Sequence, residues 1–267
     1  MHALRRWLGT AVVVGVIAAL AGCGTRSGGL VPVGTVQPDQ FLYERGTAAI
    51  TNKKWLAARE YLKQLVETYT QSTYRPDGKL GLGDTYLGEN SSESLVLAIN
   101  EFQEFLSFYP TNARADYAQY KIGLAHFQQM RKPQRDQTET REAVKALETF
   151  VARYPNSSLM DEVKSKLREA HDRLSDADYE VGFFYYRSRW YPGAVDRFKS
   201  ILKLDPEYTR RDAVYFYLGE SLSKTRQRAE ALPYYEKVVQ DFERSDYIQE
   251  AQKRITELKA QPQATLP

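Results

Sequence analysis

The sequence predicts an all-α solenoid of about five helical hairpins, with an additional helix between the third and fourth hairpins. Small residues recur 12 positions apart along the chain, and large apolar or aromatic residues follow them at helical spacing. No segment of note alternates polar and apolar residues as a strand does. Because one hairpin cannot bury its apolar face alone, the repeated units are expected to stack on one another.

Residues 1–22 have the layout of a secretory signal peptide. Two arginines, Arg5 and Arg6, precede the apolar run Trp7–Leu20, and the small residues Ala21 and Gly22 follow it. The run is shorter than the roughly 20 residues that a bilayer-spanning helix needs. A permanent membrane span is therefore the weaker interpretation.

Cys23 is the only cysteine of the chain, so no internal disulfide can form. The segment Leu20-Ala21-Gly22-Cys23 resembles the bacterial lipobox, which implies cleavage before Cys23 and a lipid attached to its sulfur. A buried cysteine in an N-terminal helix is the alternative. Gly24 follows where retention in the inner membrane usually requires aspartate, so we expect lipid anchoring to the periplasmic face of the outer membrane.

Residues 23–40 carry glycine and proline without helical periodicity and are expected to form a lipidated flexible tether. The tail 261–267 is similarly unpatterned. Signal cleavage removes two arginines and no acidic residue, so the formal charge falls from +3 to +1. This balance argues against nucleic acid as a partner and against a polybasic membrane patch.

The two strongest repeats resemble the tetratricopeptide pattern. Gly182 precedes Ala194 by 12 residues, and Gly219 precedes Ala231 by the same distance. Small residues at these positions allow the two helices of a hairpin to approach closely, and proline ends the second helix in several copies. The earlier and looser copies pair Gly46 with Ala58, Gly83 with Ala98, and Gly123 with Ala143, the last two across insertions.

The segment 158–175 places apolar residues at helical spacing opposite a charged face. It predicts the additional helix, which would divide the chain into an N-terminal group of three repeats, residues 41–157, and a second group, residues 158–260. The second group would contain the additional helix and repeats four and five.

The sequence contains no familiar catalytic or metal-binding motif. Of its three histidines, His126 and His171 follow the signal segment, and neither belongs to a zinc signature. The glycine-rich stretch around Lys79 lacks the Gly-Lys-Ser/Thr of a phosphate loop. We therefore expect a binding protein without catalytic residues, metal or cofactor.

The third repeat carries an insertion containing Arg135-Asp136-Gln137-Thr138, and its second helix ends in Tyr154-Pro155-Asn156-Ser157. With the additional helix that follows, this order resembles the BamD family of outer-membrane assembly lipoproteins. Repeat one is weak, and Glu243 replaces the closing proline of repeat five. The resemblance implies a subunit of the machinery that inserts β-barrels into the outer membrane.

The resemblance also implies partners. The C-terminal repeats would dock on a periplasmic POTRA domain of the barrel protein BamA, beside other assembly lipoproteins, and the N-terminal repeats would recognise unfolded β-barrel proteins. Arg197 matches the position of a basic contact to BamA, and Arg187 and Arg189 lie nearby in the sequence. An ordinary solvated arginine beside Phe198 is the alternative for Arg197.

In such solenoids one face of each first helix lines a concave groove. An aromatic groove suits an extended segment that ends in an aromatic residue. For Tyr120 and Phe127 the equal alternative is packing against neighbouring helices. The candidate substrate groove comprises Tyr43, Tyr117, Tyr120, Leu124 and Phe127, and the C-terminal repeats present Tyr179, Phe183, Tyr186 and Arg187.

Two other functions fit parts of the pattern. Another lipid-anchored tetratricopeptide adaptor of the cell envelope, for pilus assembly or cell division, would share the anchor and the solenoid but not the insertion. An envelope hydrolase or transglycosylase adaptor with catalytic residues hidden in the insertions would show a cleft with strongly shifted carboxylate pKa values.

Overall fold

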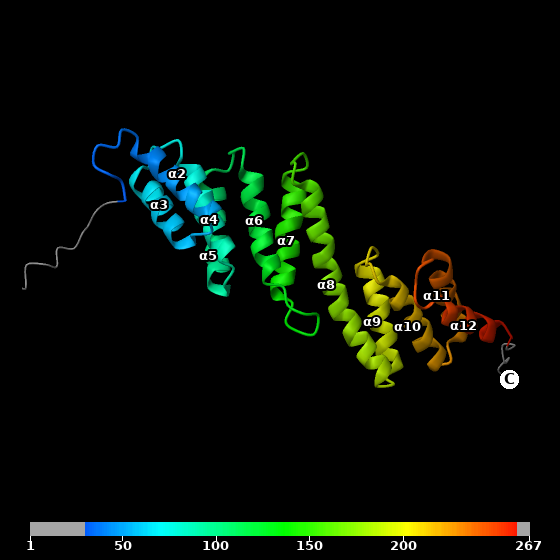
Figure 1. The fold of residues 1–267 in the computed structure, drawn as a ribbon. Coiled ribbons are helices and arrows are strands. Elements are labelled where there is room, and N and C mark those ends of the chain that lie inside the picture. Colours follow the sequence, from blue (N-terminus) through cyan, green and yellow to red (C-terminus); the bar gives the residue numbers. More distant parts are fainter. Residues whose placement is uncertain (1–29, 261–267) are drawn as a thin grey trace, which may run out of the picture.

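The computed structural model describes residues 30–260, so Cys23, the signal segment 1–22 and the tail 261–267 lie outside the described residues. Within the described range every regular element is an α-helix (Figure 1). The prediction of an all-α solenoid is confirmed. The helices are α2 (Pro38–Thr51), α3 (Trp55–Thr68), α4 (Arg75–Glu89), α5 (Ser92–Phe108), α6 (Ala115–Gln128), α7 (Thr138–Arg153), α8 (Met160–Arg187), α9 (Tyr191–Leu204), α10 (Arg211–Lys224), α11 (Arg228–Asp241) and α12 (Ile248–Ala260).

Successive helices pack as antiparallel hairpins that stack into an elongated array (Figure 1). The five hairpins are α2 with α3, α4 with α5, α6 with α7, the second half of α8 with α9, and α10 with α11, and α12 packs on the end of the array. Helix α2 begins at Pro38, three residues before the expected start of the repeats.

The predicted small-residue positions are where the helices of a hairpin approach most closely. Each predicted glycine is buried, and so is each predicted alanine. A Cβ atom added to Gly83 would lie 2.6 Å from ring carbons of Phe102, which is fully buried. At Gly219 it would lie 2.9 Å from Tyr235. These aromatic rings occupy the space that a side chain at the glycine would need.

The segment expected as a separate additional helix is the first half of α8, a single helix of 28 residues. No glycine or proline interrupts it before Gly182, so it continues into the first helix of repeat four. Val163 near its start packs with Phe150 of repeat three, whereas Tyr179 contacts the ring of Phe198 in repeat four. One helix of about 42 Å therefore joins the two groups of repeats.

Three of the loops that follow a hairpin, those after α3, α7 and α11, share a serine–aspartate clasp. In the first, Ser72 donates a hydrogen bond of 2.7 Å to Asp39 on the preceding hairpin and accepts one of 3.1 Å from the backbone N–H of Tyr74. Ser157 and Asp116 repeat the arrangement at 2.6 Å. Ser245 and Asp212 repeat it again at 2.7 Å. The clasp fixes the path of the chain from one hairpin to the next.

Candidate partner-binding surfaces

The predicted groove begins at Tyr43 of α2, which is half-buried. Its ring stacks on that of Tyr74, with centroids 5.1 Å apart and planes inclined by 22°. Burial, together with the charge of Asp77, raises the pKa of the Tyr43 hydroxyl. Asp77 also forms an ion pair of 2.8 Å with Arg114, so the groove is charged as well as aromatic at this end.

Tyr117 lies deeper in the groove and is engaged on several sides. Its hydroxyl lies 2.8 and 2.9 Å from the two carboxylate oxygens of Asp84, to which it donates. The Arg114 guanidinium and the Lys121 ammonium lie 4.8 and 4.9 Å from its ring centroid. Burial raises the pKa of Asp84, and the Tyr117 hydrogen bond and the charge of Lys121 only partly oppose this rise.

The remaining groove candidates differ in their exposure. Tyr120 is only 4% exposed, lies edge-on to Phe150, and donates a hydrogen bond to Glu162, so it packs against neighbouring helices. Leu124 is half-buried between two core clusters. Phe127 is half-buried, with the Lys166 ammonium 4.5 Å from its ring centroid.

Cations and carboxylates of the groove were not identified from the sequence, although one signal was present. Lys121 follows Tyr117 by four residues and Asp84 sits on the neighbouring first helix, so all three share the concave face. In the structure Lys121 lies over the ring of Tyr117, and Asp84 accepts a hydrogen bond from the Tyr117 hydroxyl. Lys166 lies over the ring of Phe127.

The equivalent face of the C-terminal repeats is filled by other aromatic rings. Tyr179 and Phe183 are stacked, with centroids 5.9 Å apart. Tyr217 of α10 lies against Phe183 at 4.9 Å and against Tyr186 at 5.1 Å. Burial and the neighbouring Tyr247 hydroxyl raise the pKa of Tyr217 to about 12. This surface is a packed aromatic cluster.

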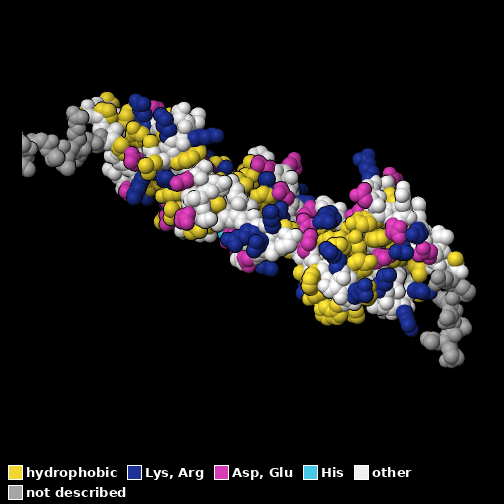
Figure 2. Space-filling view, turned by 60° about the horizontal axis from the view of Figure 1, so that its bottom comes forward, with side chains coloured by type: hydrophobic (Ala, Val, Ile, Leu, Met, Phe, Trp, Pro, Cys, Tyr) yellow, Lys and Arg dark blue, Asp and Glu magenta, His cyan; other side chains and the backbone are white. Residues whose placement is uncertain are grey.

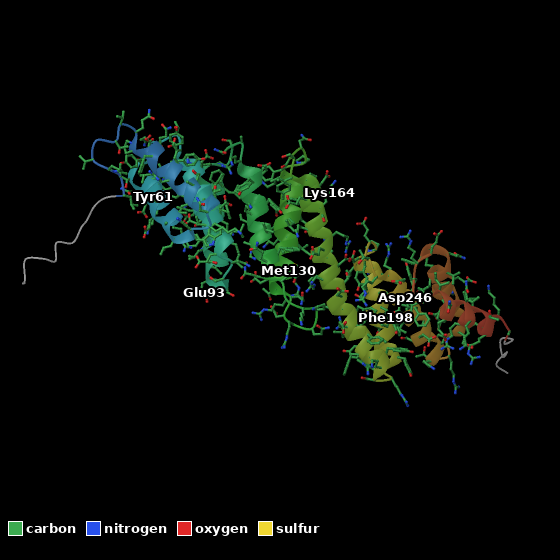
Figure 3. All side chains as sticks on the ribbon, in the orientation of Figure 1. Tyr61, Glu93, Met130, Lys164, Phe198 and Asp246 are labelled. Atoms are coloured by element: carbon green, nitrogen blue, oxygen red, sulfur yellow. The ribbon has the colours of Figure 1, made fainter. Side chains whose placement is uncertain are left out.

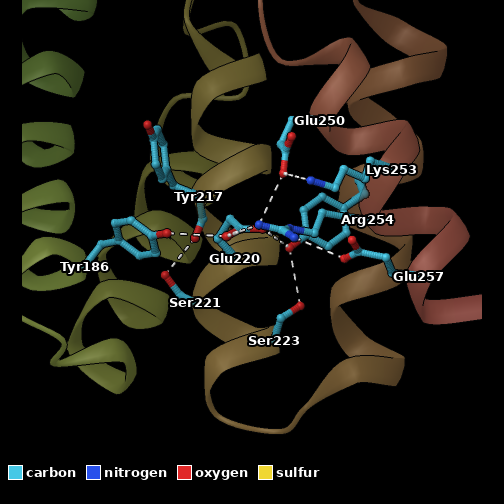
Figure 4. Close-up of polar contacts among 10 residues, drawn as sticks. Tyr186, Tyr217, Glu220, Ser221, Ser223, Glu250, Lys253, Arg254 and Glu257 are labelled. Atoms are coloured by element: carbon cyan, nitrogen blue, oxygen red, sulfur yellow. Dashed lines mark hydrogen bonds and ion pairs between the residues drawn. The ribbon is translucent and has the colours of Figure 1, made fainter. Parts of the chain in front are cut away.

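A buried carboxylate lies beside this cluster (Figure 4). The Glu220 side chain is 6% exposed and accepts hydrogen bonds from Arg254 Nε at 2.6 Å and from the Tyr235 hydroxyl at 2.7 Å. The hydrogen bond to Glu220 raises the pKa of Arg254, despite an opposing effect of burial. Glu250 and Glu257 flank the same guanidinium, so the network ties α12 to α10.

The three candidate arginines lie around the α8–α9 turn. Arg197, in the second turn of α9, is exposed and forms a 3.4 Å ion pair with the exposed side chain of Asp178. Arg187 ends α8 and Arg189 lies in the turn itself. Both are exposed, and neither has an ion-pair partner among residues 30–260.

Comparisons with known proteins give the family of this scaffold. A family model described as an outer membrane lipoprotein, YfiO, matches residues 36–221. The chain belongs to this outer membrane lipoprotein family. A tetratricopeptide repeat model also matches residues 213–245.

Relatives of the chain are named outer membrane protein assembly factor BamD. The relative from Caulobacter vibrioides is 27% identical over 213 residues, covering 79% of this chain and 68% of the relative. The relative from Vibrio cholerae is 26% identical over 201 residues, covering 72% and 80%. The predicted resemblance to the BamD family of outer-membrane assembly lipoproteins is confirmed.

Between residues 30 and 260 no helix combines the length and the apolar character that crossing a membrane requires. The same range contains no group of three or more histidine, cysteine, aspartate and glutamate side chains arranged to hold a metal ion.

Proposed function

We propose that the protein is a non-enzymatic subunit of the machinery that assembles β-barrels in the outer membrane. It would hold BamA through its C-terminal repeats and an unfolded barrel protein through its N-terminal groove. The observation that carries this proposal is the family match, which extends from the first hairpin through the insertion and α8 into α10. Binding two partners on one scaffold raises their effective concentration near one another, and this requires no catalytic residues.

The client groove is proposed to centre on Tyr43, Tyr117 and Phe127, with Leu124 at its floor. These rings are half-buried, and the cations over Tyr117 and Phe127 are long side chains that can move aside. An extended client segment ending in an aromatic residue would place its ring there and its terminal carboxylate near the displaced cations. The buried Tyr120 would support the groove from behind.

Arg197 is proposed as a contact to BamA. Its ion pair with Asp178 joins two side chains that are 47% and 43% exposed, and such exposed pairs contribute little to stability. The guanidinium is therefore available to bind a carboxylate of a partner with two parallel hydrogen bonds. Arg187 and Arg189 lie at the α8–α9 turn, ten and eight residues before Arg197, and would add positive charge to the same contact.

Association with purified BamA tests this contact. We expect Arg197→Glu to weaken binding at least about tenfold, as loss of a charged interface contact does, while helicity and thermal unfolding stay unchanged. Lys199→Glu is the matched control, because Lys199 is also exposed on α9 and paired with an acid, Glu230. Equal binding by the wild type and Arg197→Glu would remove Arg197 from the interface.

The lipid anchor has its own test. We expect Cys23→Ser to release the protein from membranes after a wash at about 0.5 M salt, where electrostatic attraction is screened within a few ångströms. Retention of this variant in the washed membranes would show that acylation is not the sole anchor.

A pull-down of the tagged protein from detergent-solubilised outer membranes tests the function as a whole. Recovery of BamA in stoichiometric amount is the expected result. Recovery of pilus or cell-division proteins in its place would leave the family and the solenoid intact and would overturn the assembly role.

A further inference from the structure

The loops within the hairpins all lie along one edge of the solenoid, at the bottom of Figure 1. We call the loops 52–54, 90–91, 129–137, 188–190 and 225–227 the turn edge. They contain seven basic residues and one acidic residue, Asp136, whereas the four loops that join successive hairpins, 69–74, 109–114, 154–159 and 205–210, contain two acidic and two basic residues in all. The net charge of +3 conceals this separation. The basic residues of the turn edge are Lys53, Lys54, Arg131, Lys132, Arg135, Arg189 and Arg226.

These basic side chains are exposed, and none of them forms an ion pair in the part of the chain that the structure describes. Many other lysines and arginines of the described chain are paired, such as Arg59 with Glu89 and Lys79 with Glu101. Within residues 30–260, therefore, no ion pair neutralises the basic residues of the turn edge.

The backbone at three of these residues is strained. Lys53, Arg189 and Arg226 have φ of 55°, 62° and 65°, at equivalent positions two residues before the second helix of their hairpins. Asn90 occupies the same position in hairpin two with φ of 58°, and asparagine tolerates this left-handed conformation better than lysine or arginine does. Folding alone would favour asparagine or glycine there, so the basic residues point to a role outside folding.

Exposed apolar side chains accompany the charges. Trp190 in the fourth turn is 55% exposed, Phe184 in the last turn of α8 is 64% exposed, and Leu56 in the first turn of α3 is 68% exposed. Figure 2, which turns the bottom of Figure 1 toward the viewer, shows basic and hydrophobic side chains side by side on this face. Aromatic residues beside basic residues are typical of proteins that lie on a membrane surface.

We propose that the turn edge rests on the surface of a bilayer that contains anionic phospholipid. The basic residues extend over four of the five hairpins, which suits a broad anionic surface better than a compact acidic site on a protein. From the predicted lipidation site, residues 23–29 reach at most about 24 Å when extended. Residue 30 is thus held near the membrane, and each basic residue close to an anionic surface raises partitioning about fivefold.

Vesicle flotation tests the proposal. The chain from residue 23 with Cys23→Ser contains every described helix and lacks the acyl anchor. It is mixed with vesicles of phosphatidylethanolamine and phosphatidylglycerol, or with phosphatidylethanolamine and phosphatidylcholine, at about 50 mM salt. The test variant combines Lys53→Asn, Lys132→Gln and Arg226→Asn, and leaves Arg189 and Arg197 unchanged so that the proposed BamA contact is intact.

The control removes the same charge from the opposite edge by Lys164→Gln, Lys203→Gln and Arg244→Gln. These residues are exposed and lie in or next to the loops that join hairpins, and Figure 3 labels Lys164 at the upper edge, opposite Glu93 and Met130. We expect the turn-edge variant to bind anionic vesicles at least about tenfold more weakly and the control to bind as the parent chain does.

The two asparagine substitutions relax the left-handed backbone, so the turn-edge variant is expected to unfold at the same temperature as its parent or higher. Equal losses in both variants, or no loss in the turn-edge variant, would overturn the proposal. It would also fail if the parent chain did not float with the anionic vesicles. We expect Arg197→Glu to float as the parent chain does. Bilayer binding can then be distinguished from binding to BamA.

Discussion

The two ends of the solenoid are built from the same repeat but are filled differently. From the second half of α8 to α12 the buried apolar residues form one continuous cluster, which runs from Tyr179 to Ala251. The three N-terminal hairpins instead contain separate clusters, of which the smallest surrounds Leu62 in the first hairpin. In a repeat array each hairpin depends on its neighbours, so the N-terminal hairpins are expected to open locally more readily.

The concave faces differ in the same way. In the N-terminal groove the rings of Tyr117 and Phe127 are covered by lysine and arginine side chains. In the C-terminal half Phe183 and Tyr186 are covered by Tyr217, which packs against the core of the C-terminal repeats. Flexible cations can move aside for a ligand, whereas displacing a packed ring would disrupt a hairpin. The N-terminal face is therefore suited to a changing client and the C-terminal face to a fixed partner.

The largest expected change in stability concerns the ion pair between Glu220 of α10 and Arg254 of α12. Arg254→Met leaves the Glu220 carboxylate buried without its cation, and we expect unfolding to become easier by about 3 kcal/mol. Urea denaturation measures this, and hydrogen exchange should place the change in α10 and α12. Glu257→Gln, which removes only an exposed partner of Arg254, should change stability by less than about 0.5 kcal/mol. A loss below about 1 kcal/mol for Arg254→Met would mean that the network does not hold α12.

A second pair of variants compares the two halves directly. Gly83→Ala would force its Cβ to within 2.6 Å of the buried Phe102 ring, whereas at Gly219 the nearest ring atom is 2.9 Å away. Overpacking outweighs the better helix propensity of alanine, so we expect losses of about 2 kcal/mol for Gly83→Ala and about 1 kcal/mol for Gly219→Ala. Thermal denaturation gives both values, and the reverse order would contradict the assignment of Gly83 as the tighter contact.

The stability that Asp205, in the loop after α9, gains from Arg168 of α8 should be lost in acid. Burial raises the pKa of Asp205, but hydrogen bonds from Arg168 and Ser175 and the charge of Arg168 bring it below its ordinary value. A carboxylate with a lowered pKa contributes stability above its unfolded pKa of 3.8, and this contribution is lost as the pH falls through the folded pKa. We expect Asp205→Asn to cost about 1.5 kcal/mol at pH 7 and to flatten the loss of stability below pH 4. If the variant lost stability below pH 4 as steeply as the wild type does, Asp205 would be excluded as the cause of that loss.

The smallest expected effect lies in the N-terminal groove. Burial raises the pKa of Asp84, so the folded protein binds this proton more tightly than the unfolded chain, and the contribution of Asp84 to stability falls as the pH rises above 3.8. Asp84→Asn removes the charge and keeps an acceptor for the Tyr117 hydroxyl. We expect stability at pH 7 to stay equal or to rise by up to about 1 kcal/mol in urea denaturation. A loss would show that the charged hydrogen bond outweighs the burial of the carboxylate.

The repeats, the close approach of paired glycine and alanine positions, and the BamD-family resemblance followed from the sequence alone. They could be predicted because each depends on local spacing: helical periodicity identifies the buried face, and small residues 12 positions apart identify three of the five hairpins. The insertion in repeat three is equally local, since it interrupts a regular pattern.

Tertiary structure decided what covers each face. Tyr120 and Tyr117 share one helix and one predicted groove, yet Tyr120 is buried because Phe150 of α7 and Glu162 of α8 approach it. The Glu220–Arg254 contact likewise joins residues far apart in the chain. Net charge could not reveal the basic turn edge, because a sum over the sequence discards the positions that stacking brings to one side.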